Sequence, residues 1–211
     1  MTICLVTDRR RADPLAQARA AAASGVDLIQ VRERDLDASA LAMLVRALVG
    51  AVRGVRTERR PDTPTRVVVN DRLDVALACG ADGVHLRADS MPAAAARRIA
   101  PPGFLVGRSV HSAREAATAG DVDYLIAGTV FSTSSKPDCT APLGEDGLRR
   151  IVAAARAPVL AIGGVTVDAC EAIARAGAAG IAAIGLFGVP EALDALVRTL
   201  RSRFDSAKTA P

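Results

Sequence analysis

The chain has 211 residues, a net charge of +4, and 50% hydrophobic but only 2% aromatic residues. This length suits one α/β domain, and the aliphatic composition is typical of helices packed on buried parallel strands. The sequence contains no apolar run long enough for a membrane span, no signal peptide and no zinc-binding cysteine spacing. We therefore expect a cytoplasmic protein.

Short apolar runs rich in β-branched residues alternate with segments of helical periodicity along the chain. In chain order we expect strand 3–7, helix 14–24, strand 27–32, helix 39–52, strand 66–69, helix 73–79, strand 83–86, helix 92–99, strand 104–107, a helix capped by Ser112, strand 123–127, helix 146–155, strand 158–162, a helix ending at 176, strand 180–184 and helix 190–204. Residues 205–211 are expected to form a disordered tail.

One type of junction between a helix and the next strand recurs at 24–27, 80–83, 119–123 and 177–180. In each, a glycine ends the helix and a short turn leads into the strand. Eight strands joined to helices in this way predict a single (β/α)₈ TIM barrel over residues 1–204, with its active site at the carboxyl ends of the strands. An open doubly wound sheet is the alternative, but no GxGxxG motif follows the first strand.

Gln30, Arg32 and Arg34 lie at the end of the second expected strand. Alternation along a strand puts these three side chains on one face. Two guanidinium groups in one pocket suit bidentate recognition of phosphate. The alternative is a solvated run of charges in which Glu33 and Asp35 pair with the arginines.

Asn70 and Asp71 follow the third expected strand. Mg²⁺ prefers oxygen ligands and is usually bound through one or two carboxylates, with phosphates completing its shell. The alternative is that Asn70 caps the helix that begins at Leu73. The two interpretations are compatible, because Asn70 could cap the helix while Asp71 binds the metal.

Further polar residues follow the fifth and sixth strands. Ser109 is a candidate hydroxyl donor to phosphate, whereas His111 is more simply explained as a structural histidine. The loop 128–144 is long for a barrel connection, and Thr133, Ser135 and Lys136 in it could grip an anion. An ordinary polar loop is the alternative.

Glycines follow the seventh and eighth strands, where barrels commonly bind phosphate through exposed backbone N–H groups. Gly164, Ile184 and Gly185 are the candidates there, and a short helical turn near Phe187 would add its positive end. Tight turns without a ligand are the alternative. Taken together, the rim residues predict a metal-bound diphosphate near Arg32 and Asp71 and a second phosphate near Gly164.

Seven segments occur in an order that resembles a known family: LVTD, QVRER, VNDRLDVALACGADGVHL, GRSVHS, GTVFSTSSK, APLGEDGL and VLAIGGV. They resemble the thiamine-phosphate synthase family, which also contains thiazole tautomerases and has a (β/α)₈ fold. The synthase joins hydroxymethylpyrimidine diphosphate to thiazole phosphate and releases diphosphate, by way of a pyrimidine cation. The resemblance implies small phosphate-bearing substrates and Mg²⁺, and leaves the oligomeric state open, with a homodimer among the options.

The resemblance also implies residue roles. The diphosphate would be held by Gln30, Arg32, Arg34, Asn70, Ser109, Thr133, Ser135 and Lys136. The thiazole phosphate would be held by Gly164, Ile184 and Gly185. Arg32, Ser109 and Lys136 are the candidate catalytic residues, and Asp71 would bind Mg²⁺. Basic residues cluster at 9–11 and 53–60, but we expect no nucleic-acid partner, because aromatic side chains for base stacking are scarce.

The sequence departs from the synthase pattern after the fourth strand. Synthases carry a second metal-binding aspartate there, in a pattern like HLGQxD, whereas HLRADS has Ser90 at that position and Asp89 one residue earlier. Asp89 is the candidate replacement, provided that the strand ends by Leu86 and an irregular turn follows. Otherwise Asp71, diphosphate oxygens and water would suffice.

A tautomerase and a catalytically silent phosphate-binding barrel remain alternatives. Residues 90–92 resemble the tautomerase branch, but tautomerases typically carry a histidine at the position of Thr129.

Overall fold

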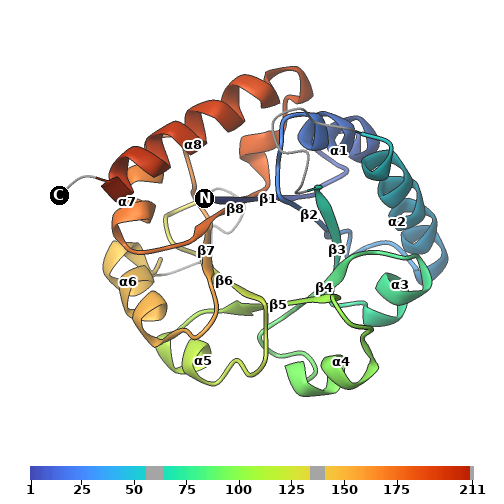
Figure 1. Cartoon of the computed structure of the whole chain (residues 1–211), viewed down its shortest axis with the longest axis horizontal. Coiled ribbons are helices and arrows are strands. Elements are labelled where there is room, and N and C mark those ends of the chain that lie inside the picture. The colour runs from blue at the N-terminus through green and yellow to red at the C-terminus, as the bar shows by residue number, and fades with distance from the viewer. Residues whose placement is uncertain (56–63, 134–140, 210–211) are drawn as a thin grey trace.

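The computed structural model describes residues 1–55, 64–133 and 141–209. Eight parallel strands form a closed barrel in the order β1 to β8, and β8 pairs with β1 to complete it (Figure 1). The elements are β1 (Thr2–Val6), α1 (Pro14–Ala23), β2 (Leu28–Val31), α2 (Ala38–Arg53), β3 (Arg66–Asn70), α3 (Leu73–Ala78), β4 (Gly83–Leu86), α4 (Ala93–Ile99), β5 (Leu105–Val110), α5 (Ala113–Ala117), β6 (Tyr124–Gly128), α6 (Gly144–Ala154), β7 (Val159–Ile162), α7 (Cys170–Arg175), β8 (Gly180–Ala183), the 3₁₀ turns η1 (Gly185–Phe187) and η2 (Pro190–Ala192), and α8 (Leu193–Thr209). The predicted (β/α)₈ barrel is therefore confirmed.

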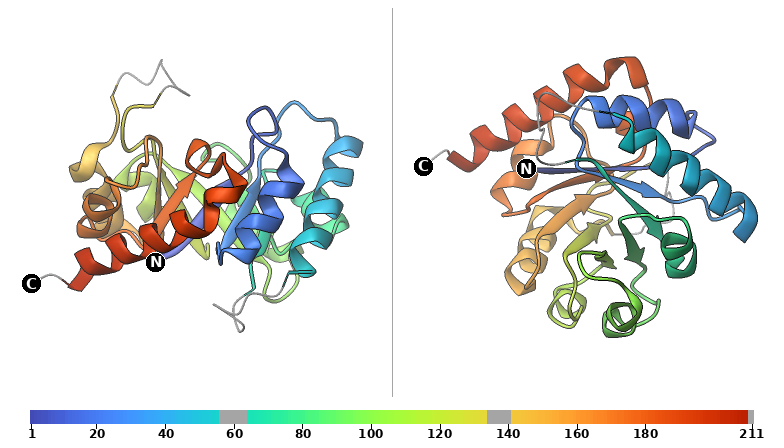
Figure 2. Two further views of the ribbon diagram at one scale, coloured as in Figure 1. Left: turned by 90° about the horizontal axis from the view of Figure 1, so that it is seen from above. Right: turned by 45° about the vertical axis from the view of Figure 1, so that its right-hand side comes forward.

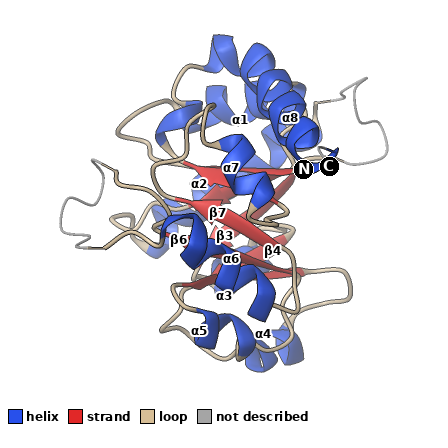
Figure 3. Ribbon diagram, turned by 90° about the vertical axis from the view of Figure 1, so that its left-hand side faces the viewer, coloured by secondary structure: helices blue, strands red, loops and turns tan. Residues whose placement is uncertain are grey.

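The helices form a ring around the strands (Figure 1), and the side view in Figure 3 shows helices above and below the strands. Helices α8, α1 and α2 lie side by side around one part of the barrel (Figure 2). No helix in the described part of the chain is both long and apolar enough to cross a bilayer.

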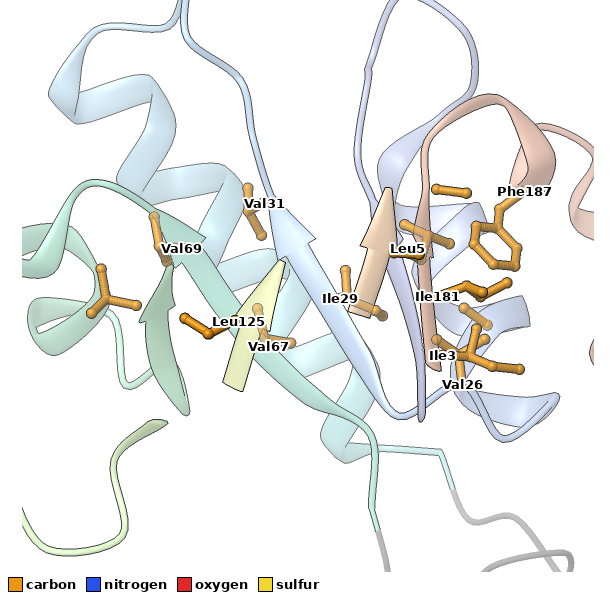
Figure 4. Close-up of a cluster of buried hydrophobic side chains, with 14 of the residues drawn as sticks. Ile3, Leu5, Val26, Ile29, Val31, Val67, Val69, Leu125, Ile181 and Phe187 are labelled. Atoms are coloured by element: carbon orange, nitrogen blue, oxygen red, sulfur yellow. The ribbon is translucent and has the colours of Figure 1, made fainter. Parts of the chain in front are cut away.

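Alternate side chains of each strand point to opposite faces and form two layers. The outer layer packs against the helices, and part of it is visible in Figure 4: Ile3, Leu5, Ile29, Val31, Val67 and Val69. Each of these side chains is at most 1% exposed, so each contributes about 1.5–3 kcal/mol to the free energy of folding. The inner layer fills the barrel with Cys4, Val6, Leu28, Val68, Tyr124, Ile126, Leu160 and Ala182.

The recurring junctions form the lower rim of the barrel, at the amino ends of the strands. Their glycines have the positive φ values that a helix-ending glycine adopts: Gly25 (79°), Gly80 (67°), Gly120 (83°) and Gly177 (86°). Three junctions also carry an aspartate whose Oδ2 accepts a hydrogen bond from a backbone N–H of the preceding strand; the pairs are Asp27 with Ile3 (2.7 Å), Asp82 with Val67 (2.7 Å) and Asp123 with Val106 (2.6 Å). The repeat in the sequence is therefore a repeated way of joining neighbouring strands.

Two predicted boundaries are corrected by the structure. β5 runs to Val110, so Ser109 lies inside the strand and not after it. The last helix continues to Thr209 instead of ending at residue 204. It continues because this helix packs on the start of the chain: the Met1 amino group lies 3.8 Å from the Asp205 Oδ1, and Arg201 donates hydrogen bonds to the carbonyl oxygens of Met1 (2.6 Å) and Gly25 (2.7 Å).

Candidate active site

A pocket of about 530 Å³ opens at the carboxyl ends of the strands. Eight of the residues predicted from the sequence line it: Gln30, Arg32, Arg34, Asn70, Asp89, Ser109, Thr133 and Ile184. The structure therefore brings together side chains that are far apart in the sequence. Ser135 and Lys136 lie outside the described residues.

Arg32 and Arg34 share this pocket, whereas Glu33 and Asp35, their acidic neighbours in the sequence, are not among its lining residues. Glu33 is buried and accepts hydrogen bonds from the Thr7 hydroxyl (2.7 Å) and the Arg9 backbone N–H (3.1 Å). Within the described ranges, no carboxylate forms an ion pair with Arg32 or Arg34. The alternative of a charge run paired with Glu33 and Asp35 therefore does not match the structure.

The electrostatic environment of Arg32 is unfavourable for its charge. Burial, and then the positive charge of Arg34, lower the pKa of Arg32 below the usual value for arginine. Two guanidinium groups that repel each other in a partly buried pocket favour an anionic ligand, because a ligand with two negative charges would relieve the repulsion.

Gln30 and Asn70 form the wall of the pocket between β2 and β3. The Gln30 Nε2 donates a hydrogen bond to the Asn70 Oδ1 at 3.0 Å, which fixes both amides. Asn70 does not cap α3: the residue at the N-cap position is Arg72, and no side chain makes a capping hydrogen bond there. The capping interpretation was wrong because Asn70 is the last residue of β3 and faces the barrel interior.

His85, which was not among the candidate residues predicted from the sequence, lies in the barrel interior below Ser109. Its Nε2 lies 2.9 Å from the Ser109 Oγ and its Nδ1 lies 3.3 Å from the Tyr124 hydroxyl. Burial, with a smaller contribution from the charge of Arg32, lowers the pKa of His85 to about 3. His85 is therefore a neutral imidazole that links Tyr124 to Ser109. Alternation in Val84-His85-Leu86 could have predicted its inward direction.

Asp71 and Asp89 flank a single guanidinium, that of Arg87. The Arg87 Nε donates to the Asp89 Oδ1 at 2.9 Å, and its Nη1 lies 3.8 Å from the Asp71 Oδ2. β4 ends at Leu86 and a turn follows, which is the condition that the sequence set for Asp89 to reach the rim. Asp71 has a positive φ of 60° and lines a smaller adjoining pocket of about 220 Å³.

Asp71 and Asp89 offer carboxylate oxygens, the kind of donor that Mg²⁺ prefers, to the same guanidinium. Within the described ranges, no group of three His, Cys, Asp or Glu side chains could hold a metal ion. A magnesium ion here would therefore have one or two protein carboxylates and depend on phosphate oxygens and water, which is common for this ion.

The glycines after β7 and β8 lie across the barrel from the ends of β3 and β4, where Asp71 and Asp89 are located. Gly163 and Ile184 line the pocket, whereas Gly164 and Gly185 are not among the lining residues. Gly164 has a φ of 62°, and a Cβ there would lie 2.5 Å from the Ser132 carbonyl oxygen, so no other residue fits. The short turn expected near Phe187 is present as η1, and it begins at Gly185.

Two other features of the rim concern its basic residues and His111. Arg9 and Arg10 of the first basic cluster both pair with Asp35, at 2.7 and 2.9 Å, so part of that positive charge is neutralised. The ring Nδ1 of His111 donates a hydrogen bond to the Gly128 carbonyl oxygen. This contact fits the structural role expected for His111, although the residue also lines the pocket.

Residues 3–187 match the family model described as thiamine monophosphate synthase. The chain belongs to this family. It is 44% identical over 194 residues to the thiamine-phosphate synthase of Methanoregula boonei, covering 90% of this chain and 86% of that protein. It is 42% identical over 193 residues to the thiamine-phosphate synthase of Methanoculleus marisnigri, covering 90% and 88%.

A solved family structure has the same architecture. The thiamine phosphate pyrophosphorylase from Pyrococcus furiosus superposes with a TM-score of 0.81 at 33% identity, covering 98% of this chain and 96% of that one. A 3-hexulose-6-phosphate synthase superposes with a TM-score of 0.66 at 20% identity, which shows a shared fold alone. The thiamine monophosphate synthase family is therefore supported by both sequence and structure.

Proposed function

We propose that this chain is a thiamine-phosphate synthase, a transferase that joins hydroxymethylpyrimidine diphosphate to thiazole phosphate and releases diphosphate. Besides family membership, one observation carries the proposal: Arg32 and Arg34 share a pocket in which no described carboxylate pairs with them. A pocket of this kind suits a diphosphate, because each guanidinium can bind phosphate oxygens in a bidentate manner.

The reaction breaks the bond between the pyrimidine methylene carbon and the diphosphate oxygen, and the diphosphate leaves with the electron pair. The thiazole nitrogen then forms the new bond to that carbon. Arg32 stabilises the negative charge that develops on the leaving group, together with Arg34, and Lys136 is proposed to contribute a third positive charge. No general base is required, because the attacking nitrogen carries a free electron pair.

Ser109 is proposed to donate a hydrogen bond to the diphosphate. His85 and Tyr124, which lie deeper in the barrel, would orient the Ser109 hydroxyl group. When His85 carries its proton on Nε2, the Tyr124 hydroxyl donates to Nδ1 and Nε2 donates to the Ser109 Oγ. The Ser109 hydroxyl hydrogen then points to the ligand. Gln30, Asn70, Thr133 and Ser135 complete the proposed set of diphosphate contacts.

Asp71 and Asp89 are the residues that would hold Mg²⁺, and the bound ion would neutralise charge on the departing diphosphate. Asp89 is held by Arg87 and is more exposed, with 68% of its side chain accessible against 25% for Asp71. Asp71 is therefore the principal proposed ligand.

The thiazole phosphate is proposed to bind on the opposite side of the rim. Gly164, Ile184 and Gly185 would present backbone N–H groups there. The left-handed backbone at Gly163 and Gly164 and the turn that starts at Gly185 support this assignment. The two substrates would then meet over the centre of the barrel.

The test is to incubate the purified protein with both substrates and Mg²⁺ and to measure diphosphate and thiamine phosphate together. We expect equal amounts of the two products, and a strong dependence of the rate on Mg²⁺. The absence of both products above background would contradict the proposal.

A thiazole tautomerase is the second candidate, favoured by the resemblance of residues 90–92 to that branch. Against it, Thr129 lines the pocket at the position where tautomerases typically carry a histidine. Isomerisation of a thiazole carboxylate phosphate in the absence of Mg²⁺ and diphosphate would favour this candidate. A barrel that binds both substrates and converts neither would be a silent paralogue.

A further inference from the structure

Arg87 contacts both carboxylates that are proposed to bind Mg²⁺. Its Nε and Nη2 donate to the two oxygens of Asp89, and its Nη1 lies 3.8 Å from the Asp71 Oδ2. The Arg87 backbone N–H also donates to the Asp71 Oδ1 at 3.3 Å. One protein cation is therefore placed against the same carboxylates that a divalent cation would use.

The contacts between these side chains are weak enough to exchange. The side chains of Arg87 and Asp89 are 45% and 68% exposed, and exposed ion pairs contribute little to stability. A divalent cation that binds Asp71 and Asp89 must separate the guanidinium from both, because two cations repel each other at this distance.

Arg87 also lines the main pocket together with Arg32 and Arg34. It therefore stands between the proposed metal position and the proposed diphosphate position. Once separated from Asp71 and Asp89, its guanidinium remains within a pocket that already carries two arginines, where a diphosphate would be the available counter-charge.

We propose that Arg87 occupies the metal position in the metal-free protein and moves to the diphosphate when a divalent cation binds Asp71 and Asp89. The exchange couples the two ligands: the metal releases an arginine that binds diphosphate, and diphosphate draws that arginine away from the metal position. By linkage, each ligand then raises the affinity for the other. This inference rests on the proposed diphosphate site, and it adds a specific role for Arg87.

The first measurement is titration of Mn²⁺ into the full-length protein without substrate, followed by electron paramagnetic resonance of the free ion. Arg87→Gln should bind Mn²⁺ about fivefold more tightly than the wild type, which corresponds to loss of a competing exposed ion pair. Asp71→Asn should bind it more weakly than either. Equal or weaker Mn²⁺ binding by Arg87→Gln would overturn the proposal.

The second measurement is the affinity for inorganic diphosphate at saturating Mn²⁺, measured by calorimetry. Arg87→Gln should bind diphosphate about tenfold more weakly, the loss expected for one charge-assisted contact. Unchanged diphosphate affinity in this variant would also overturn the proposal. If instead the wild type binds no diphosphate, the proposed function fails, and the Mn²⁺ titration still tests the competition by itself.

Arg72→Gln is the matched control for both measurements. Arg72 pairs with Asp74 through its Nε and Nη2, as Arg87 does with Asp89, and has a similar exposure of 38%. It does not line the main pocket, but it lines the smaller pocket with Asp71, so Arg72→Gln removes a positive charge near the proposed metal position without removing the Arg87 contacts to Asp71 and Asp89. We expect a smaller gain in Mn²⁺ affinity than in Arg87→Gln and wild-type affinity for diphosphate; changes equal to those of Arg87→Gln would reduce the effect to general electrostatics and overturn the specific role.

Discussion

The two rims of the barrel use the same residue types for different purposes. At the lower rim, Asp27, Asp82 and Asp123 each accept a hydrogen bond from a strand N–H, and Arg201 and Arg97 pair with Asp27 and Asp123 at 2.9 and 2.7 Å. The upper rim is formed by the carboxyl ends of the strands. There, Arg32 and Arg34 line a pocket, and neither forms an ion pair with a described carboxylate. The source of the counter-charge therefore separates a structural ion pair from a binding site: the chain supplies it at the lower rim, and a ligand must supply it at the upper rim.

The largest expected effect is at the upper rim. Arg32→Ala removes a charge that stabilises the leaving diphosphate, which should cost about 3 kcal/mol of transition-state stabilisation, or about a hundredfold in kcat/KM. The free energy of unfolding should not fall, because the substitution also relieves repulsion with Arg34. Steady-state kinetics and urea unfolding of the same preparation check both parts. A loss of stability in place of a loss of activity would remove the distinction between the rims.

The lower rim should respond in the opposite way. Asp82→Ala leaves the buried Val67 N–H without its acceptor, which should lower the free energy of unfolding by about 2 kcal/mol. The kcat/KM of the folded variant should equal that of the wild type. Asp82→Asn is the control, because its amide oxygen can still accept the hydrogen bond and should restore much of the stability. Urea unfolding measures both variants; a large loss of activity in folded Asp82→Ala would contradict the assignment of this rim to stability.

His85, between the two rims, should make stability depend on pH. Its pKa is about 3 in the folded protein and near 6.5 in the unfolded chain, so the unfolded state takes up the proton first as the pH falls. The contribution is fully present above about pH 6.5 and is lost progressively towards about pH 3, amounting to about 1 kcal/mol between about pH 7 and pH 5.5. His85→Gln should remove this part of the pH dependence in urea unfolding. An identical slope in both proteins would mean that His85 is not held neutral.

The smallest expected effect concerns an exposed pair beside the site. Asp74→Asn removes the partner of Arg72 but leaves both side chains in solvent, so the free energy of unfolding should change by less than about 0.5 kcal/mol. Thermal unfolding checks this expectation. A loss of stability as large as that of Asp82→Ala would show that an exposed ion pair can stabilise the protein as much as the Asp82 hydrogen bond does, and would contradict the distinction between the two kinds of contact.

Much of the fold was predictable because its signals are local. The helix-ending glycines, such as Gly25 and Gly80, mark the junctions directly, and each strand is a short apolar run between them. Period-two alternation predicted that Gln30, Arg32 and Arg34 share one face, and all three line the pocket, although β2 ends at Val31 and Arg34 lies in the turn that follows. The end of the last helix was missed because it depends on packing against Met1 and Gly25, which are distant in the sequence.

The parts of the site that depend on strand pairing were not predictable. Asp71 meets Arg87 because β3 and β4 are neighbours: the Asp71 backbone N–H donates to the His85 carbonyl oxygen at 2.9 Å, which sets the Asp71 carboxylate beside the next turn. The residues next to Asn70 in the sequence predicted a helix cap, whereas its partner, Gln30, comes from the adjacent strand. Neither pairing leaves a signal in the local sequence.

The central claim, that the upper rim binds diphosphate through Arg32 and Arg34, is tested most directly by calorimetric titration of inorganic diphosphate with Mg²⁺ into three proteins. These are the wild type, Arg32→Ala and the lower-rim variant Asp82→Asn. We expect one binding site in the wild type, the same affinity in Asp82→Asn, and an affinity weaker by at least about tenfold in Arg32→Ala. Equal affinities in the wild type and Arg32→Ala would contradict the claim.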